Sequence, residues 1–332
     1  MRYQTLGKSG LRASVAALGT WGLGGGSVWS DETPDAAAAE RLLDKAEELG
    51  INYIDTAPVY GTGRSEELLG RALRGRREKF LLQSKCSLNW RGEGGNFHYS
   101  RDGFTVNNDT SAAAVRRDVE DSLRRMGTDW LDVVVVHYVC GDWSVEETAG
   151  ALEELRREGK IRAFGLSNSR PADLEDYQKY ADVALVQEQF GLLAPLHGEE
   201  YFPMAAKYGV TFQCYGALEE GYLTGPESFE RTYPRGDIRA RLPWTEEPRR
   251  SAILRLYREV WGPMRDKYDC SYANLFQAWT LARYPEMSLL TGCRRAETLE
   301  DTVRALDLRL ETEDLRRLSE TAKEVQVAML DK

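Results

Sequence analysis

The sequence has little of what marks a nucleic-acid-binding, membrane or secreted protein. Acidic residues outnumber basic ones by 53 to 44, so the formal net charge is −9 and the isoelectric point is about 5.2. A nucleic-acid partner is therefore not expected, because phosphate contacts need a basic surface. No apolar run approaches the roughly 20 residues of a membrane span. The opening segment, MRYQTLGKSGLRASV, also lacks the apolar stretch of a secretory signal.

Cysteine and histidine are scarce as well. The five cysteines are scattered and form no C-x-x-C pair: Cys86, Cys140, Cys214, Cys270 and Cys293. We expect reduced thiols in a cytoplasmic protein. The three histidines, His98, His137 and His197, do not have the spacing of metal ligands, so no metal site is expected.

What the chain does contain is a repeated alternation of short apolar segments with amphipathic, charged ones. The predicted strands are residues 15–21, 51–57, 80–85, 131–137, 161–168, 184–190, 211–217 and 287–292. Apolar strands separated by helices favour a parallel sheet covered by helices. Eight such units in roughly 300 residues favour a closed (β/α)8 TIM barrel.

Both ends of this barrel can be sketched from the sequence. Residues 2–13, RYQTLGKSGLRA, predict a small β-hairpin with a glycine turn that plugs the N-terminal end. Long segments at 86–110 and 222–244 follow the third and seventh strands and predict long loops at the C-terminal face. No linker rich in Pro, Gly or Ser divides the chain, so we expect one domain over residues 1–332.

A doubly wound dinucleotide-binding fold is the main alternative. The segment GTWGLGGGSVW is rich in glycine, but Ser27 stands where the last glycine of G-x-G-x-x-G belongs. No helix opens directly after it, as that fold requires. We therefore expect these glycines to let a loop pass close to a ligand or to another backbone.

Four polar residues stand at or just beyond the ends of consecutive strands. Asp55 ends the second strand and is followed by Tyr60, while Lys85 and His137 end the third and fourth. Each alone has an ordinary explanation, such as a turn cap, a solvated strand end or a hydrogen-bonded histidine. In a barrel, however, the C-terminal ends of the strands meet at one mouth, where such enzymes carry their chemistry.

Together these four groups suit proton delivery. A free tyrosine has a pKa of about 10, and a nearby lysine cation favours the phenolate. A carboxylate beside that lysine keeps it charged, and an imidazole can orient a substrate oxygen or join a proton relay. The set is therefore suited to protonating a carbonyl oxygen as hydride reaches the carbon.

At these residues the chain resembles the aldo-keto reductase superfamily. The motifs NYIDTAPVYGTGRSEELLGRAL, QSK, VVVVHY and GKIRAFGLSN occur in order, and the resemblance runs from LGTWGLGG to TGCRRAETLEDTVRAL. It implies a (β/α)8 barrel that binds a nicotinamide cofactor, usually NADPH, without a Rossmann domain. It also implies that Asp55, Tyr60, Lys85 and His137 form the catalytic tetrad, with Tyr60 as proton donor.

The resemblance further implies a cofactor site. Ser167, Asn168 and Gln187 would hold the nicotinamide carboxamide, and Tyr215 would lie under the ring. Gly216, Leu218 and Gly221 would belong to the loop over the pyrophosphate. The segment that binds the adenosine 2′-phosphate would contribute Gly292, Arg294, Arg295, Thr298, Asp301 and Thr302. These arginines predict NADPH rather than NADH.

The substrate is less defined. Trp21, Trp90 and Tyr138 are predicted to form the pocket wall. Aromatic residues in the two long segments suit a sugar or other polyol, or else only anchor loops on the barrel rim. We expect an oxidoreductase that interconverts the carbonyl of an aldehyde, ketone or sugar with an alcohol. Reduction or epimerisation at a sugar carbon, and a non-catalytic NADPH-binding regulatory subunit like the potassium-channel β-subunits, are the alternatives. The oligomeric state is left open.

Overall fold

Eight parallel strands close into a barrel. The computed structural model describes residues 1–30, 33–92, 94–292 and 295–327. The strands follow the order β10-β11-β12-β13-β3-β4-β5-β9 around the closed barrel. They are β3 (Ala16–Gly19), β4 (Tyr53–Asp55), β5 (Leu81–Cys86), β9 (Leu131–Val136), β10 (Ile161–Ser167), β11 (Leu185–Gln189), β12 (Thr211–Tyr215) and β13 (Met287–Gly292). This confirms the predicted (β/α)8 architecture, and every predicted strand overlaps one of these with ends that agree within two residues.

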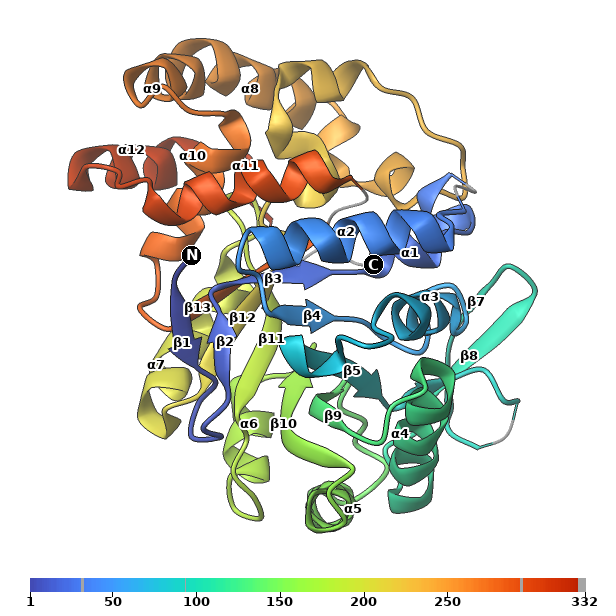
Figure 1. Cartoon of the computed structure of the whole chain (residues 1–332). Helices are drawn as coiled ribbons and strands as arrows, with labels where there is room; N and C mark the ends of the chain where they lie inside the picture. The colour runs from blue at the N-terminus through green and yellow to red at the C-terminus, as the bar shows by residue number, and fades with distance from the viewer. Residues whose placement is uncertain (31–32, 93, 293–294, 328–332) are drawn as a thin grey trace.

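Helices surround the barrel on its outside (Figure 1). The ring consists of α2 (Ala36–Glu48), α3 (Arg64–Ala72), α4 (Ala112–Met126), α5 (Val145–Arg157), α6 (Pro171–Tyr177), α7 (Leu196–Tyr208), α10 (Tyr272–Ala282) and α11 (Ala296–Asp307). Further helical segments are α1 (Trp21–Gly24), α8 (Arg249–Leu256), a π-helical turn η7 (Tyr257–Trp261), α9 (Gly262–Lys267) and α12 (Thr312–Ala322). Within the described ranges, no helix is both long and apolar enough to cross a membrane.

Local sequence signals set several helix ends. The side chains of Asp35, Ser111 and Ser144 accept a backbone N–H in the first turns of α2, α4 and α5. Gly127 ends α4 with a φ of 63°, a left-handed conformation in which glycine meets no steric penalty. Ser65, by contrast, is not the N-cap of α3, because that helix already begins at Arg64.

A hairpin closes the N-terminal end of the barrel. The antiparallel strands β1 (Tyr3–Thr5) and β2 (Arg12–Ser14) lie at the end opposite the β7–β8 hairpin (Figure 1). Leu6 and Leu11 are buried in a cluster with barrel residues such as Tyr53. Gly7 approaches the carbonyl of Ala184 so closely that a Cβ would lie 2.4 Å from its oxygen. The predicted plug is therefore present.

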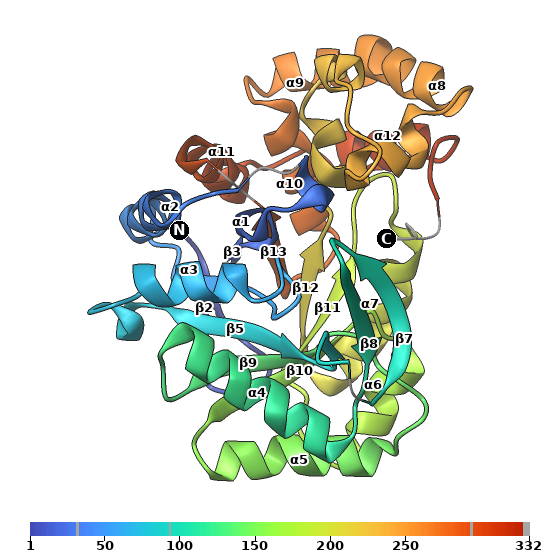
Figure 2. The same ribbon diagram turned by 90° about the vertical axis from the view of Figure 1, so that its right-hand side faces the viewer.

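The two long segments form structure over the C-terminal face. The first folds into a three-stranded sheet of β6 (Leu88–Asn89), β8 (Phe104–Asn108) and β7 (Asn96–Arg101), and its β7–β8 hairpin projects from that face (Figure 2). The second forms short helical turns, η3 (Glu219–Thr224), η4 (Pro226–Glu230), η5 (Ile238–Arg241) and η6 (Pro243–Thr245). Both reach the loop after β3, which includes η1 (Ser27–Trp29): Asp102 accepts a bond from the Ser27 N–H at 3.3 Å, and Ser30 donates to Asp237.

Candidate active site

A cavity of about 740 Å³ opens at the C-terminal face of the barrel. Most of the side chains predicted from the sequence line it: Trp21, Asp55, Tyr60, His137, Tyr138, Ser167, Asn168, Gln187, Tyr215, Gly216, Leu218, Gly221, Gly292, Arg295 and Thr298. They come from all but one of the barrel strand ends. Lys85, from the remaining strand, lies buried beneath the cavity floor. The barrel therefore brings the predicted site residues to one place.

Two glycine backbones position Tyr60. A Cβ on Gly61 would lie 2.2 Å from the carbonyl oxygen of Gly24, and a Cβ on Gly24 would lie 2.6 Å from the carbonyl carbon of Tyr60. Gly61 also has a φ of +64°. The glycines near residue 24 therefore let one loop touch the backbone of the tyrosine turn, which is one of the two uses that the sequence suggested.

Lys85 joins Asp55 to Tyr60. Its Nζ donates to both carboxylate oxygens of Asp55, at 2.7 and 2.8 Å, and to the Thr56 carbonyl at 2.8 Å. The same nitrogen lies 3.2 Å from the Tyr60 hydroxyl. Asp55 and Lys85 are each 1% exposed. A buried pair of opposite charges with this many hydrogen bonds holds the ammonium in one position against the phenol.

His137 lies across the cavity from Tyr60. The two ring centroids are 6.1 Å apart and nearly perpendicular. Burial, together with the positive charge of Lys85, holds the pKa of His137 well below its ordinary value, so the imidazole is neutral at pH 7. Its Nδ1 is buried without a hydrogen-bond partner among the described residues. An unpaired acceptor is more readily tolerated than an unpaired N–H, which favours the proton on Nε2.

The pKa of Tyr60 shifts in the direction opposite to the expectation from sequence. Burial, and after it the negative charge of Asp55, raises this pKa well above its ordinary value. The expectation counted the lysine cation but neither the burial of the phenol nor the direct effect of the Asp55 charge on it. Tyr60 is thus a protonated phenol in this structure, which is the form that a proton donor needs.

One end of the cavity presents amide and hydroxyl groups. Asn168 donates to the carbonyl of His137 at 2.9 Å and accepts from the Tyr215 hydroxyl at 2.6 Å. Ser167 donates to the Gln187 carbonyl at 2.6 Å. Asn168 has a φ of +48°, a left-handed conformation that asparagine tolerates better than most residues. These bonds link the ends of β9, β10, β11 and β12 into one rigid rim.

Glu188 of the barrel strand β11 supports this rim from the outer side of the barrel, and this role was not predicted. The buried Glu188 accepts bonds from the backbone N–H and hydroxyl of Ser169, at 3.1 and 2.8 Å. His197 of α7 contacts its other oxygen at 3.0 Å. Glu188 is a charged residue within a predicted apolar strand, but the sequence does not indicate that Ser169 and His197 are its partners. It anchors the residue that follows Asn168.

Arg295 is one of the arginines that line the cavity. Arg295 lies at the N-terminus of α11 and lines the cavity with Thr298. Thr302 and Asp301 do not line it. The Thr302 hydroxyl is bonded to Gln277 and to the Thr298 carbonyl, while Asp301 accepts from Ser271 at 2.7 Å. These two residues join α11 to α10, so their predicted cofactor contacts do not agree with their positions. Arg294 falls outside the described residues.

The aromatic wall differs from the expectation at one position. Trp21 and Tyr138 line the cavity, and Trp21 stacks on Tyr60 with centroids 6.0 Å apart. Trp90 does not line it, because its ring lies under the guanidinium of Arg125 at 5.5 Å. The cavity is lined instead by Trp29 and by His98, Tyr99 and Phe104 of the first long segment, whose aromatic residues were expected either to suit a sugar or to anchor loops. His98 lies 4.5 Å from Tyr138 between ring centroids.

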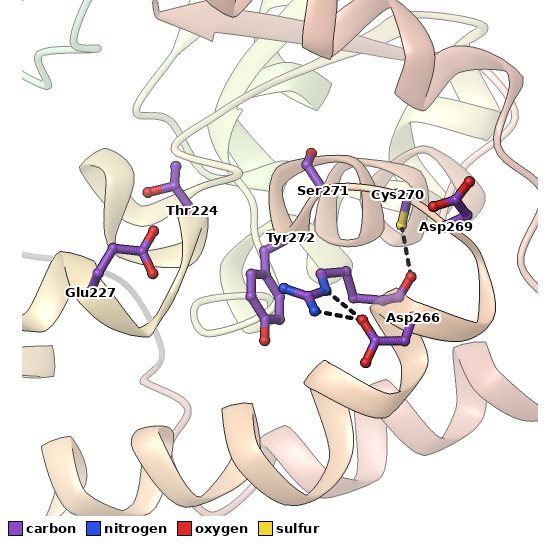
Figure 3. Close-up of a pocket in the computed structure, with 8 residues that line it drawn as sticks. Thr224, Glu227, Asp266, Asp269, Cys270, Ser271 and Tyr272 are labelled. Atoms are coloured by element: carbon purple, nitrogen blue, oxygen red, sulfur yellow. Dashed lines mark hydrogen bonds and ion pairs between the residues drawn. The ribbon is translucent and has the colours of Figure 1, made fainter.

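A second hollow, of about 500 Å³, lies between η4 and the start of α10 (Figure 3). Within it, Arg265 is bonded to Asp266 and lies over the Tyr272 ring. Burial raises the pKa of the Cys270 thiol there to about 11, which makes it a poor nucleophile. No group of three His, Cys, Asp or Glu side chains within the described ranges is arranged to hold a metal ion.

The comparisons with known proteins agree with this geometry. The sequence profile described as the aldo/keto reductase family matches residues 17–323. The chain belongs to this family. An NADH-specific methylglyoxal reductase of Escherichia coli (strain K12) is 31% identical over 330 residues, which cover 98% of this chain and 100% of that protein. The family resemblance inferred from the tetrad motifs is therefore confirmed.

Other relatives show how widely this barrel is used. The structure of a glycerol dehydrogenase from Gluconobacter oxydans superposes with a TM-score of 0.86 at 30% identity and covers 99% of this chain and 97% of that one. A probable voltage-gated potassium channel subunit beta of Oryza sativa subsp. japonica is 28% identical over 325 residues, covering 93% of this chain and 92% of that protein. This chain is an oxidoreductase of the aldo-keto reductase family.

The residues present fit a nicotinamide cofactor, which members of this family use. The amide and hydroxyl rim around Asn168 and the ring of Tyr215 lie at one end of the cavity. Gly216 and Gly221, with φ of +76° and +98°, and Arg295 line the same cavity. These groups are of the kinds that a nicotinamide dinucleotide can bond.

Proposed function

We propose that this protein reduces a small aldehyde, ketone or sugar carbonyl to an alcohol, and catalyses the reverse reaction, with NADPH as the preferred cofactor. The observation that carries the proposal is the contact of 3.2 Å between Lys85 Nζ and the hydroxyl of Tyr60, which lines a cavity whose polar groups suit a nicotinamide cofactor. A bound nicotinamide would supply the hydride.

The side chains then have distinct roles. Tyr60, whose raised pKa keeps its proton on the phenol, donates that proton to the carbonyl oxygen. Lys85 stabilises the phenolate that remains, and Asp55 keeps the ammonium in place. The neutral imidazole of His137 donates from Nε2 to the same carbonyl oxygen and so orients it. In the oxidising direction, the phenolate accepts the proton of the alcohol.

The cofactor preference is proposed from Arg295. Its guanidinium lines the cavity at the start of α11, where backbone N–H groups also favour an anion. An adenosine 2′-phosphate is the anion by which NADPH differs from NADH. The name of the Escherichia coli relative specifies NADH, so a direct comparison of the two cofactors is part of the test.

A substrate screen followed by NADPH and NADH absorbance tests the activity. The panel contains methylglyoxal, glycerol with its aldehyde, several sugars and inositols, and simple aldehydes. We expect steady turnover with at least one carbonyl and faster turnover with NADPH. Cofactor binding without turnover of any of these compounds would favour a regulatory subunit, the alternative that the rice relative makes worth testing.

A further inference from the structure

The barrel interior below Asp55 carries three glutamine side chains. Gln83 of β5, Gln187 of β11 and Gln213 of β12 are at most 2% exposed. Barrels of this kind usually fill such positions with branched apolar side chains. Of the three, only Gln187 was expected at the cofactor. Gln83 and Gln213 have no role in the site described above.

Two of the three amides donate to one carboxylate oxygen, and the third accepts from both of them. Gln83 Nε2 donates to Asp55 Oδ1 at 2.6 Å, and Gln187 Nε2 donates to the same oxygen at 2.9 Å. Each of these two nitrogens also donates to Gln213 Oε1, at 2.8 and 2.7 Å. Tyr53 joins the network from β4, because its hydroxyl donates to Gln83 Oε1, while Gln213 Nε2 is buried without a hydrogen-bond partner among the described residues.

The charge of Asp55 determines which way each amide points. A carboxylate can only accept hydrogen bonds, so Gln83 and Gln187 must turn their NH₂ groups toward it. The second N–H of each group then needs an acceptor in the barrel interior, and Gln213 Oε1 serves both. Without that oxygen, two buried N–H groups would be unpaired, and the amides would gain by turning away from Asp55.

We propose that Gln213 and Gln83 are positioning residues that hold the Asp55 carboxylate, and through it Lys85, against Tyr60. This inference rests on the proposed function, in which Tyr60 transfers the proton. Gln213 touches neither the cavity nor Lys85 and acts only through the two amides that bond Asp55. Because the NH₂ group of Gln187 is already bonded within this network, its side-chain carbonyl oxygen is the group that can bond a ligand.

The test compares Gln213→Met with Thr211→Val. Methionine preserves the approximate volume of glutamine but removes the shared acceptor. Thr211 is buried on the same strand and bonds Gly7 and Thr5 of the N-terminal hairpin, so its variant loses buried hydrogen bonds without touching Asp55. Loss of a hydrogen bond to a charged group typically changes an equilibrium or rate constant by roughly ten- to a hundred-fold. We expect Gln213→Met to lower kcat by about tenfold, with the cofactor dissociation constant changed less than about twofold.

The pH profile separates positioning from general structural damage. The titratable groups around Asp55 are Tyr53 on β4, Tyr60 in the turn after β4 and Lys85 on β5. His137 on β9 lies beyond Lys85. Burial, and after it the Asp55 carboxylate, raises the pKa of Tyr60, so a carboxylate displaced from its position raises this pKa less. The alkaline limb of the kcat profile should therefore move to lower pH in Gln213→Met and stay in place in Thr211→Val.

A crystal structure of Gln213→Met gives a readout that does not depend on turnover. The amides of Gln83 and Gln187 should turn, and the Asp55 carboxylate should move relative to Lys85. A simple packing defect would leave these side chains in their wild-type positions. Tyr53→Phe removes only the outer hydroxyl and should show a smaller effect of the same sign on kcat, which keeps the test usable if Gln213→Met does not fold.

The outcomes are separable. If Gln213→Met behaves like Thr211→Val in kcat and pH profile, and its Asp55 carboxylate keeps the wild-type position, the inference is wrong. Activity of the wild type, lost in Tyr60→Phe, would in that case still support the proposed function. If the wild type turns over no substrate, the proposed function fails, and the side-chain positions in the Gln213→Met structure alone support or overturn the role of Gln213.

Discussion

At the scale of single residues, the site depends on how burial and charge act on one phenol. Tyr60 lies beside an ammonium, but that ammonium is paired with Asp55 at 2.7 Å. The net effect of the enclosed cavity is to raise the pKa of Tyr60. The same enclosure, with Lys85 nearby, lowers the pKa of His137. The folded site therefore holds a protonated phenol and a neutral imidazole, as the proposed donation to a carbonyl oxygen requires.

Tyr60→Phe should lower turnover by roughly 10²–10⁴-fold, the usual contribution of a general acid. The substitution removes only the hydroxyl, so the cofactor dissociation constant measured by tryptophan fluorescence should change little. Tyr3→Phe, which loses one exposed hydroxyl bonded to the Gly50 carbonyl, is the matched control. Near-normal carbonyl reduction by Tyr60→Phe would remove the tyrosine from its proposed role.

At the scale of elements, the cavity rim is supported from outside the barrel. Glu188 faces away from the lumen and bonds Ser169, the residue after Asn168, while α7 supplies His197. Burial raises the pKa of Glu188, and the bond to Glu188 raises the pKa of His197. The half-buried histidine is thus more readily protonated in the folded chain than in the unfolded one, so this contact links the stability of the rim to pH.

This link predicts a pH-dependent component of stability. Because the folded-state pKa of His197 is raised, its contribution is fully present below the unfolded value of about 6.5 and is lost as pH rises through the folded value. As pH rises from 6 to 9, the free energy of unfolding measured in urea should therefore fall more for the wild type than for His197→Gln. The control is Glu199→Gln, on the same helix as His197, which removes a surface ion pair with Arg283. It should keep the wild-type dependence of the unfolding free energy on pH. Equal slopes for wild type and His197→Gln would contradict the prediction.

At the scale of the whole molecule, three distant segments meet above the barrel. The guanidinium of Arg239 from the loop after β12 lies 5.2 Å from the Trp29 ring, which belongs to the loop after β3. Asp102 from the β7–β8 hairpin bonds Ser27 of that same loop. Side chains from all three segments line the cavity. Cofactor binding in this cavity should therefore stabilise the molecule as a whole.

Arg295→Ala should weaken NADPH by about tenfold and leave NADH nearly unchanged, because it removes a charged partner of the 2′-phosphate. The rise in Tm that each cofactor causes measures these affinities. A ligand at 100 times its Kd stabilises the fold by about 2.7 kcal/mol, and a weaker ligand at the same concentration stabilises it less. The exposed Arg304, further along α11, provides the control variant Arg304→Ala. Tighter binding of NADH than NADPH by wild type would show that the proposed preference is wrong.

Much of the architecture can be read from local patterns. Apolar strands at regular intervals predict the eight-stranded barrel, and the residues that end those strands predict which side chains share its mouth. Asp55, Tyr60, Lys85 and His137 could be grouped for this reason, since strand direction in a barrel is set by the alternation itself. Residues at loop positions were less predictable: Trp90 packs on Arg125 rather than in the cavity, and Asp301 bonds Ser271.

The remaining features depend on contacts between residues far apart in the chain. Gln83 and Gln213 are 130 positions apart, and no local pattern shows that both amides meet below Asp55. The protonation of Tyr60 likewise depends on how deeply the folded cavity encloses it and on the charge of Asp55 beside it. Strand pattern is a property of neighbouring residues, whereas hydrogen-bond partners and burial arise only when the barrel closes and brings distant strands together.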